Sequence, residues 1–233
     1  MLVNVGKLMS HTSTKGGGGV KHPFNPSLVD AWFMSGLSNN DKPSSIRGVK
    51  GNEVVLKNFA FTSESGFGEG NYEGGLVFDG VDDYGICTGL PILDDYTLIC
   101  RREIVSIKNN SAVASKRTNG SMWNGAFTFE RQSINTNNYL LNYGGSNSIP
   151  LAQNSVSYQT SFSYNGTTIN RGTAEDTDQL SLGCALVTTT GMSYEFLNCV
   201  IYYFALYNKS LTPEEIETEK ERLNEEWLKR KTE

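Results

Sequence analysis

The chain has 233 residues, of which 38% are hydrophobic and 19% charged, with 24 glycines, 11 tyrosines and 11 phenylalanines. A chain of this size buries a core without disulfides or metals, and it fits a single large all-β domain. The formal net charge of −5 offers no excess of cations to phosphate, which excludes nucleic acid as an expected partner. No stretch approaches the roughly 18 apolar residues of a membrane helix, so we expect no membrane insertion.

Residues 1–27 are predicted to form an arm outside the core. Gly16–Gly19 is typical of a flexible hinge, and Pro23 and Pro26 resist strand pairing. A small apolar patch precedes the hinge and is too short to fold alone. It consists of Leu2, Val3, Val5, Leu8 and Met9. Two interpretations stay open: a disordered tail, or an anchor that docks through this patch onto a partner protein.

Residues 28–211 show short strand-like runs separated by clusters of Gly, Asn, Asp and Ser, which favours a sandwich or barrel over βαβ units. The expected strands are 28–34, 54–59, 75–79, 84–88, 96–100, 112–114, 126–130, 139–143, 155–164, 167–170, 180–182 and 194–207. Asn165-Gly166 predicts a tight hairpin. The run 199–207 is apolar on both alternating faces, which predicts a central strand covered on both sides.

Residues 212–233 are predicted to form one helix. The segment Thr212-Pro-Glu-Glu215 combines an N-cap threonine, a proline in the first turn and a glutamate placed for a capping box. Ile216, Leu223 and Trp227 then recur at helical spacing and form one apolar stripe. The stripe packs on the flank of the domain or, as the alternative, binds a partner.

The four cysteines, Cys87, Cys100, Cys184 and Cys199, lie in or beside strand-like runs. None has the C-x-x-C spacing of a zinc or redox site. We interpret them as small buried hydrophobic residues rather than as disulfides.

Two longer motifs resemble a known family. Phe78-Asp-Gly-Val-Asp-Asp-Tyr84 resembles the FDGxDDY turn of laminin-G-like, concanavalin A-like domains, and residues 204–216 resemble the ALYNRALSxxEI ending of the same group. Ser115-Lys116 and Ser181-Leu-Gly183 match shorter features of that group. The resemblance spans roughly residues 28–220 and implies a concanavalin A-like jelly-roll β-sandwich, carried on a short N-terminal arm and ended by one C-terminal helix.

A narrower likeness concerns the start of the domain. Residues 30–36, 39–41 and 58–68 resemble versions of this domain in gut bacteria and their tailed phages. There the domain has binding or structural roles on surfaces or virions, which implies such a role here.

Enzymatic activity is not expected. His11 and His22 both lie in the arm, so no Ser-His or Cys-His dyad forms within the domain. A glycoside hydrolase needs two carboxylates that face each other across the substrate. The nearest run, Glu175-Asp-Thr-Asp178, lies in a predicted loop, and the adjacent pairs at 82–83 and 94–95 would point to opposite faces of a strand.

Two binding chemistries remain. Asp79, Asp82 and Asp83 offer hard oxygen ligands for calcium, the one cofactor worth weighing; the alternative is that they only cap a turn. Sugar binding needs aromatic faces beside polar side chains. The candidates for that role lie in the loop-rich middle of the chain, and each of them has core packing as its alternative. They are Trp123, Asn124, Arg131, Tyr139 and Tyr143.

We therefore expect a non-enzymatic structural or adhesion module. The leading hypothesis is a phage virion surface protein, of capsid or tail, assembled in the host cytoplasm, docked on other virion proteins or on a second copy through its arm, and able to bind host glycans. The alternatives are a carbohydrate-binding domain on a bacterial cell surface, cut from a larger precursor, and, last, a glycoside hydrolase. Residues 1–10 lack a signal-peptide core, so we expect a cut precursor or release by a route such as lysis.

Overall fold

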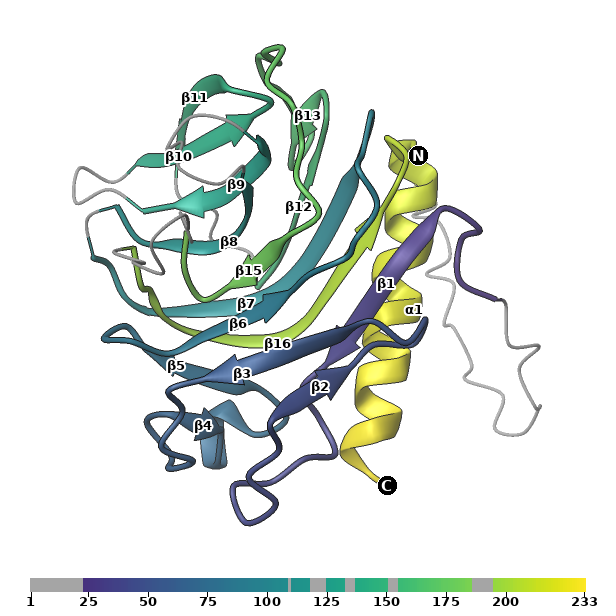
Figure 1. Ribbon diagram of the computed structural model, residues 1–233. Helices are drawn as coiled ribbons and strands as arrows, with labels where there is room; N and C mark the ends of the chain where they lie inside the picture. The colour runs from purple at the N-terminus through teal and green to yellow at the C-terminus, as the bar shows by residue number, and fades with distance from the viewer. Residues whose placement is uncertain (1–22, 109, 118–124, 133–136, 151–154, 186–194) are drawn as a thin grey trace, which may run out of the picture.

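The computed structural model describes residues 23–108, 110–117, 125–132, 137–150, 155–185 and 195–233. Over these residues the chain folds into two antiparallel sheets, with one helix along the flank of the first sheet (Figure 1). This confirms the all-β sandwich with a C-terminal helix. The predicted arm, residues 1–27, lies outside the described part except for its last five residues.

The first sheet, sheet A, has the strand order β14-β13-β12-β7-β16-β5-β4, and β1 also pairs with β16. Its strands are β1 (Leu28–Phe33), β4 (Gly66–Phe67), β5 (Leu76–Asp79), β7 (Thr97–Ser106), β12 (Val156–Thr160), β13 (Ser163–Tyr164), β14 (Thr167–Thr168) and β16 (Asn198–Tyr207). A short 3-10 helix, η1 (Gly70–Tyr72), precedes β5.

The second sheet, sheet B, has the order β11-β10-β9-β8-β15-β6-β3-β2. Its strands are β2 (Ser45–Arg47), β3 (Glu53–Lys57), β6 (Tyr84–Cys87), β8 (Ala112–Arg117), β9 (Gly125–Arg131), β10 (Asn137–Asn142), β11 (Gly145–Pro150) and β15 (Leu180–Leu182). Neighbours in the sheet are often far apart in sequence, as when β15 lies between β6 and β8.

β16 is the central strand of sheet A, as its apolar pattern predicts. It pairs with β7 on one side and with β1 and β5 on the other, and all its residues after Asn198 are buried. Its inner side chains, such as Ile201 and Phe204, join the core between the sheets, whereas Tyr203 and Tyr207 join the cluster under the helix. A register shift between Ile201 and Tyr203 moves the alternation by one residue.

The helix α1 (Pro213–Lys231) packs on the outer face of sheet A, which settles the two interpretations of its stripe. Its N-terminus has the predicted capping box, in which Thr212 and Glu215 each accept from the other's backbone N–H. Ile216, Leu223 and Trp227 are buried in one cluster with residues of β1 and β16. Figure 1 shows the helix beside these strands. Within the described residues, no helix combines the length and apolarity needed to cross a membrane.

Two other local predictions are confirmed. Asn165 and Gly166 both have positive φ (45° and 83°) and connect β13 to β14, which is the backbone geometry of a type I′ hairpin. The four cysteines are all described and buried, and none of them forms a disulfide. Burial raises the thiol pKa of Cys87 to about 11, so this side chain behaves as a small hydrophobic residue at neutral pH.

A buried ion pair joins the two sheets through the core. Arg102 on β7 donates from Nε and Nη2 to the two carboxylate oxygens of Glu130 on β9, at 2.7 and 2.8 Å, and the Tyr164 hydroxyl donates to the same carboxylate at 2.7 Å. A register shift in the β9–β10 pairing lets the consecutive residues Phe129 and Glu130 both reach the interior. This pair carries one positive and one negative charge.

Candidate functional site

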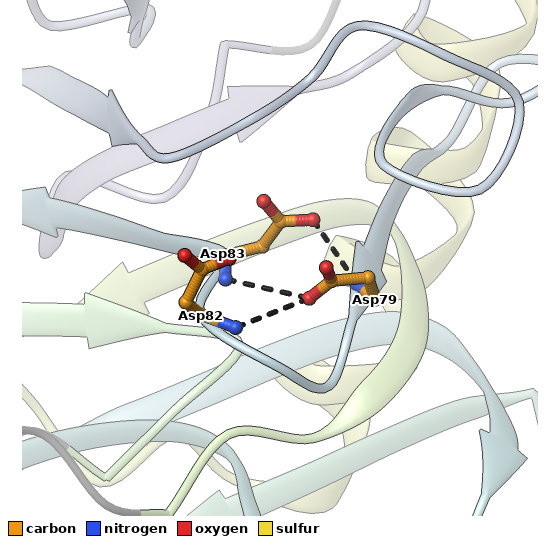
Figure 2. A group of neighbouring side chains, drawn as sticks. All are labelled: Asp79, Asp82 and Asp83. Carbon is orange, nitrogen blue, oxygen red and sulfur yellow. Dashed lines mark hydrogen bonds between the residues drawn. The ribbon is translucent and has the colours of Figure 1, made fainter.

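The acidic motif of residues 79–83 forms the turn that connects β5 of sheet A to β6 of sheet B (Figure 2). Asp79 Oδ1 accepts from the backbone N–H groups of Val81 and Asp82, at 2.7 and 3.3 Å. Asp83 accepts from the N–H of Asp79 at 3.1 Å and from the hydroxyl of Ser65 at 3.0 Å. These carboxylates therefore cap the turn.

The three carboxylates offer oxygens within 4.8 Å of one another, the spacing of a cation site. The backbone oxygens that would complete such a site already accept other bonds, Gly80 O from Lys108 Nζ at 3.0 Å and Asp82 O from Asn58 at 2.9 Å. Burial also raises the pKa of Asp83 to about 6, which makes the charged form that calcium needs less favourable than in an exposed aspartate. The geometry favours the capping alternative, and calcium binding stays a prediction.

A pocket of about 550 Å³ lies at the opposite end of the sandwich. The acidic turn adjoins the start of β16, since Asp79 pairs with Asn198, whereas this pocket adjoins its end, where Tyr207 pairs with Thr97. Its lining comes from the β6–β7 loop, the β10–β11 turn and the β14–β15 loop. The lining residues are Ile92, Leu93, Asp94, Tyr143, Arg171, Gly172, Thr173, Ala174, Glu175 and Asp176.

Tyr143 and Arg171 form one wall of this pocket. Tyr143 is buried and donates its hydroxyl to the carbonyl of Leu93 at 2.7 Å. Burial raises the pKa of Tyr143, so its hydroxyl remains a neutral donor at physiological pH. The guanidinium of Arg171 lies 4.2 Å from the centre of the Tyr143 ring and 5.7 Å from that of Phe162, and it donates to Asp95 Oδ1 at 2.6 Å. The arginine is thus oriented by two rings and a carboxylate.

A buried ion pair holds the two long loops together beneath the pocket. Lys116 on β8 is fully buried and donates to Asp176 Oδ2 at 2.5 Å and to the carbonyl of Pro91 at 3.1 Å. Asp176 Oδ2 also accepts from the N–H of Leu93 at 2.8 Å. The β6–β7 loop and the β14–β15 loop are therefore fixed to sheet B and to each other by one lysine and one aspartate.

The remaining oxygen of Asp176 is an acceptor without a donor. Its side chain is 1% exposed and lines the pocket, and its Oδ1 has no hydrogen-bond partner within the described part of the chain. A buried acceptor left unpaired is unfavourable, so a ligand hydroxyl that donates to it gains binding energy. Beside the pocket, Phe162 is 52% exposed and stacks under the arginine. Apolar ring, charged donor and buried acceptor are the groups that recognise a sugar.

Of the sequence-predicted sugar-binding residues that the structure describes, only Tyr143 lines this pocket. Arg131 is buried and paired with Glu195, and Tyr139 is 39% exposed on β10 opposite Arg131. Both Tyr143 and Arg131 thus have structural contacts, the alternative left open by the sequence. Trp123 and Asn124 lie outside the described residues, as do the predicted docking residues Leu2, Val3, Val5, Leu8 and Met9.

Sequence reasoning missed Arg171 and Phe162, and it considered Asp176 only within the acidic run 175–178, as a carboxylate for hydrolysis. The long polar segment between β14 and β15 was a usable signal, because binding residues concentrate in loops held by a rigid scaffold. Nothing in the sequence places that segment against Tyr143 and Pro91, which precede it by 20 residues or more.

A larger hollow, of about 920 Å³, lies on the outer face of sheet A beside the end of α1. Its two aromatic rings, Tyr202 and Trp227, are both buried. Arg101 covers them, with its guanidinium 4.3 Å from the centre of the Trp227 ring. The pocket at Tyr143 has the exposed ring of Phe162 beside it, whereas both rings of this hollow are buried, so the hollow is less suited to sugar stacking.

No protein-family model matches the sequence, and no curated protein matches it either. Solved structures do match the fold. The binding domain of botulinum neurotoxin serotype D/C superposes with a TM-score of 0.53 at 12% identity, over 84% of this chain and 52% of that one. The botulinum neurotoxin DC binding domain in complex with SialylT gives 0.52 at 12%, over 85% and 52%.

A sialidase from Trypanosoma rangeli, in a complex with 2,3-difluoro-KDN, gives a TM-score of 0.52 at 16% identity. The match covers 91% of this chain and 35% of the sialidase, so the chain spans about half the length of the neurotoxin domain and about a third of the sialidase. At these identities the similarity establishes a shared β-sandwich fold.

Proposed function

We propose that this protein is a non-enzymatic carbohydrate-binding module that holds a sugar in the pocket between Tyr143, Arg171 and Asp176. The observation that carries the proposal is the unpaired, buried Oδ1 of Asp176 in a pocket whose arginine is already oriented by aromatic rings. The sandwich fold, which it shares with a neurotoxin domain crystallised with SialylT, supports the proposal at the level of architecture.

In this proposal each group has one task. The Asp176 Oδ1 accepts from a sugar hydroxyl, and Phe162 covers an apolar face of the ring. Arg171 already donates from Nη1 to Asp95 and from Nη2 to the carbonyl of Asp94. Its remaining N–H groups donate to a second hydroxyl or to the ring oxygen of the sugar. Lys116 does not touch the ligand but fixes the position of Asp176. The pocket is preformed, so binding orders few side chains.

A glycan array with the full-length protein tests the proposal, followed by calorimetry on the strongest ligand. Arg171→Ala removes the oriented donor, and Arg47→Ala is the matched control, because Arg47 is an exposed arginine on β2 outside this pocket. We expect binding by the unchanged protein and by Arg47→Ala, and binding about 10- to 100-fold weaker in Arg171→Ala, the range for a hydrogen bond from a charged group.

Both variants alter exposed charges and should fold normally, which a thermal melt verifies. A second variant, Phe162→Ala, removes the exposed ring and should also weaken binding. The assignment of this pocket would be overturned if the unchanged protein bound no glycan on a broad array, or if Arg171→Ala bound the ligand as tightly as the unchanged protein.

The proposal excludes catalysis at this pocket. In this proposal the free Oδ1 of Asp176 only accepts a ligand hydroxyl, while its Oδ2 is held by Lys116 and the Leu93 amide. We expect no release of product from chromogenic glycosides during hours of incubation. Turnover that is lost in Asp176→Asn would establish a hydrolase instead.

We further propose that the module is displayed on a virion or cell surface and attached through its arm. The support is the sequence: an apolar patch, a run of glycines and two prolines before β1. Light scattering tests this by comparing the mass in solution of the full-length protein with that of a chain that begins at Pro26. Assembly of the full-length protein alone supports attachment through the arm, and identical monomers contradict self-assembly.

A further inference from the structure

Two arginines of sheet B share a single carboxylate. Arg117, at the end of β8, donates from Nη1 to Glu195 Oε2 at 3.2 Å, and Arg131, at the end of β9, donates from Nη2 to Glu195 Oε1 at 2.8 Å. Glu195 is held beside them because its carbonyl accepts from the N–H groups of Ala112 and Ala185. The three side chains are only 1%, 10% and 8% exposed.

Among the residues that the structure describes, three N–H groups of this cluster have no acceptor. They are Nε and Nη2 of Arg117 and Nε of Arg131, all buried. The contrast with Arg102 is informative, because Glu130 accepts from that guanidinium with both of its oxygens. A buried donor without an acceptor is unfavourable, so in a native protein such a group needs a partner such as an ordered water or an ion.

The charges of the cluster do not balance either. Among the described residues, Glu195 is the one acidic partner of both arginines. The segments outside the described residues contain neither aspartate nor glutamate, so they add no acidic side chain that could neutralise the second arginine. Burial lowers the pKa of Arg117, as does Arg131, while Glu195 opposes the change. Arginine nevertheless keeps its proton near neutral pH, so one uncompensated positive charge remains buried.

We propose that Arg117 and Arg131 bind one small monovalent anion, chloride or a carboxylate, beside Glu195. One negative charge balances the cluster, and the three free N–H groups supply its hydrogen bonds. A carboxylate fits the parallel donors of a guanidinium, and chloride accepts from several N–H groups at once. Arg131 and Glu195 keep slight exposure, which gives a small ion a route from solvent. The site is separate from the pocket at Arg171, which none of these residues lines.

Anion-dependent thermal unfolding of the full-length protein tests this. Sodium chloride or sodium acetate replaces sodium fluoride at constant ionic strength, so that general screening stays fixed. An anion that binds only the folded state raises the midpoint in proportion to the logarithm of its concentration once the site is occupied. The line width of the ³⁵Cl NMR signal, with and without acetate, reports binding directly.

Variants separate a specific site from a general salt effect. Arg117→Gln removes the excess charge and should abolish both the rise in midpoint and the ³⁵Cl broadening, whereas the control Arg47→Gln should keep them. Glu195→Gln retains both arginines, so it should strengthen the anion dependence, and it serves if Arg117→Gln fails to fold. Response to chloride alone or to acetate alone identifies the anion. The proposal is overturned if no anion acts, or if Arg117→Gln responds as the unchanged protein does.

Discussion

Replacing Lys116 by methionine tests how the pocket is built. The change keeps the length of the side chain and removes its charge, at a position that is fully buried on β8. Asp176 would then keep its charge at 1% exposure with the Leu93 amide as its remaining partner, and the carbonyl of Pro91 would lose its donor.

The expected loss is large because the partner charge stays behind. Removing one member of a buried ion pair costs about 3–5 kcal/mol, a major part of the roughly 5–15 kcal/mol by which a domain is stable. Asp176→Asn should cost a similar amount, because it leaves the buried charge of Lys116 without its partner. The double variant should cost about 2–3 kcal/mol less than the sum of the two single variants, because it leaves no unpaired charge.

Urea unfolding followed by tryptophan fluorescence measures the three free energies of unfolding. Lys57→Met is the matched control, because Lys57 is exposed on β3 and its loss should change stability by about 0.5 kcal/mol or less. A loss below about 1 kcal/mol in Lys116→Met, or strict additivity in the double variant, would refute the view that this pair holds the loops.

Two further predictions concern the acidic turn and the helix. The pKa of Asp83 is raised from 3.8 to about 6 in the folded state, so between these pH values the folded protein binds a proton at Asp83 that the unfolded chain does not. Protonation of Asp83 therefore stabilises the fold fully below pH 3.8, and this stabilisation is lost as pH rises through 6. We expect the difference in stability between the unchanged protein and Asp83→Asn to change by about 1–2 kcal/mol over that window, after allowance for solvent screening, as measured by urea unfolding at each pH. A constant difference would contradict this. Trp227 is buried against Tyr202 and donates to the carbonyl of Gly74 at 2.8 Å; Trp227→Ala should cost about 3–5 kcal/mol in the same assay, and exposed Leu228→Ala should cost little.

Local patterns in the sequence were sufficient for the fold class. Alternation with a period of two, the apolar run at 199–207, Asn165-Gly166 and the capping box at Thr212 each predict an element that the structure contains. These signals work because they depend on residues a few positions apart, where backbone geometry alone decides which side chains meet.

Burial on the two faces of sheet A was also predictable in part. The stripe of Ile216, Leu223 and Trp227 and the doubly apolar β16 are complementary surfaces, and the structure joins them. The sequence did not reveal that Glu219 would be buried on the same helix face, where it accepts from the Tyr207 hydroxyl at 2.9 Å. A charge on an apolar face is tolerated only when a partner from another element reaches it.

The candidate sites were decided by tertiary structure. Ser115-Lys116 is marked in the sequence only as a family-like pair, yet Lys116 meets an aspartate 60 residues away because β15 pairs between β6 and β8. Likewise Arg117 and Arg131 converge on Glu195, and Arg171 stacks on Tyr143. The order of the strands in a sheet determines which distant residues come into contact. That order depends on long-range contacts, which the local sequence pattern does not encode. The sequence by itself determined the elements and their buried faces, and the tertiary structure alone decided which charges and rings face one another.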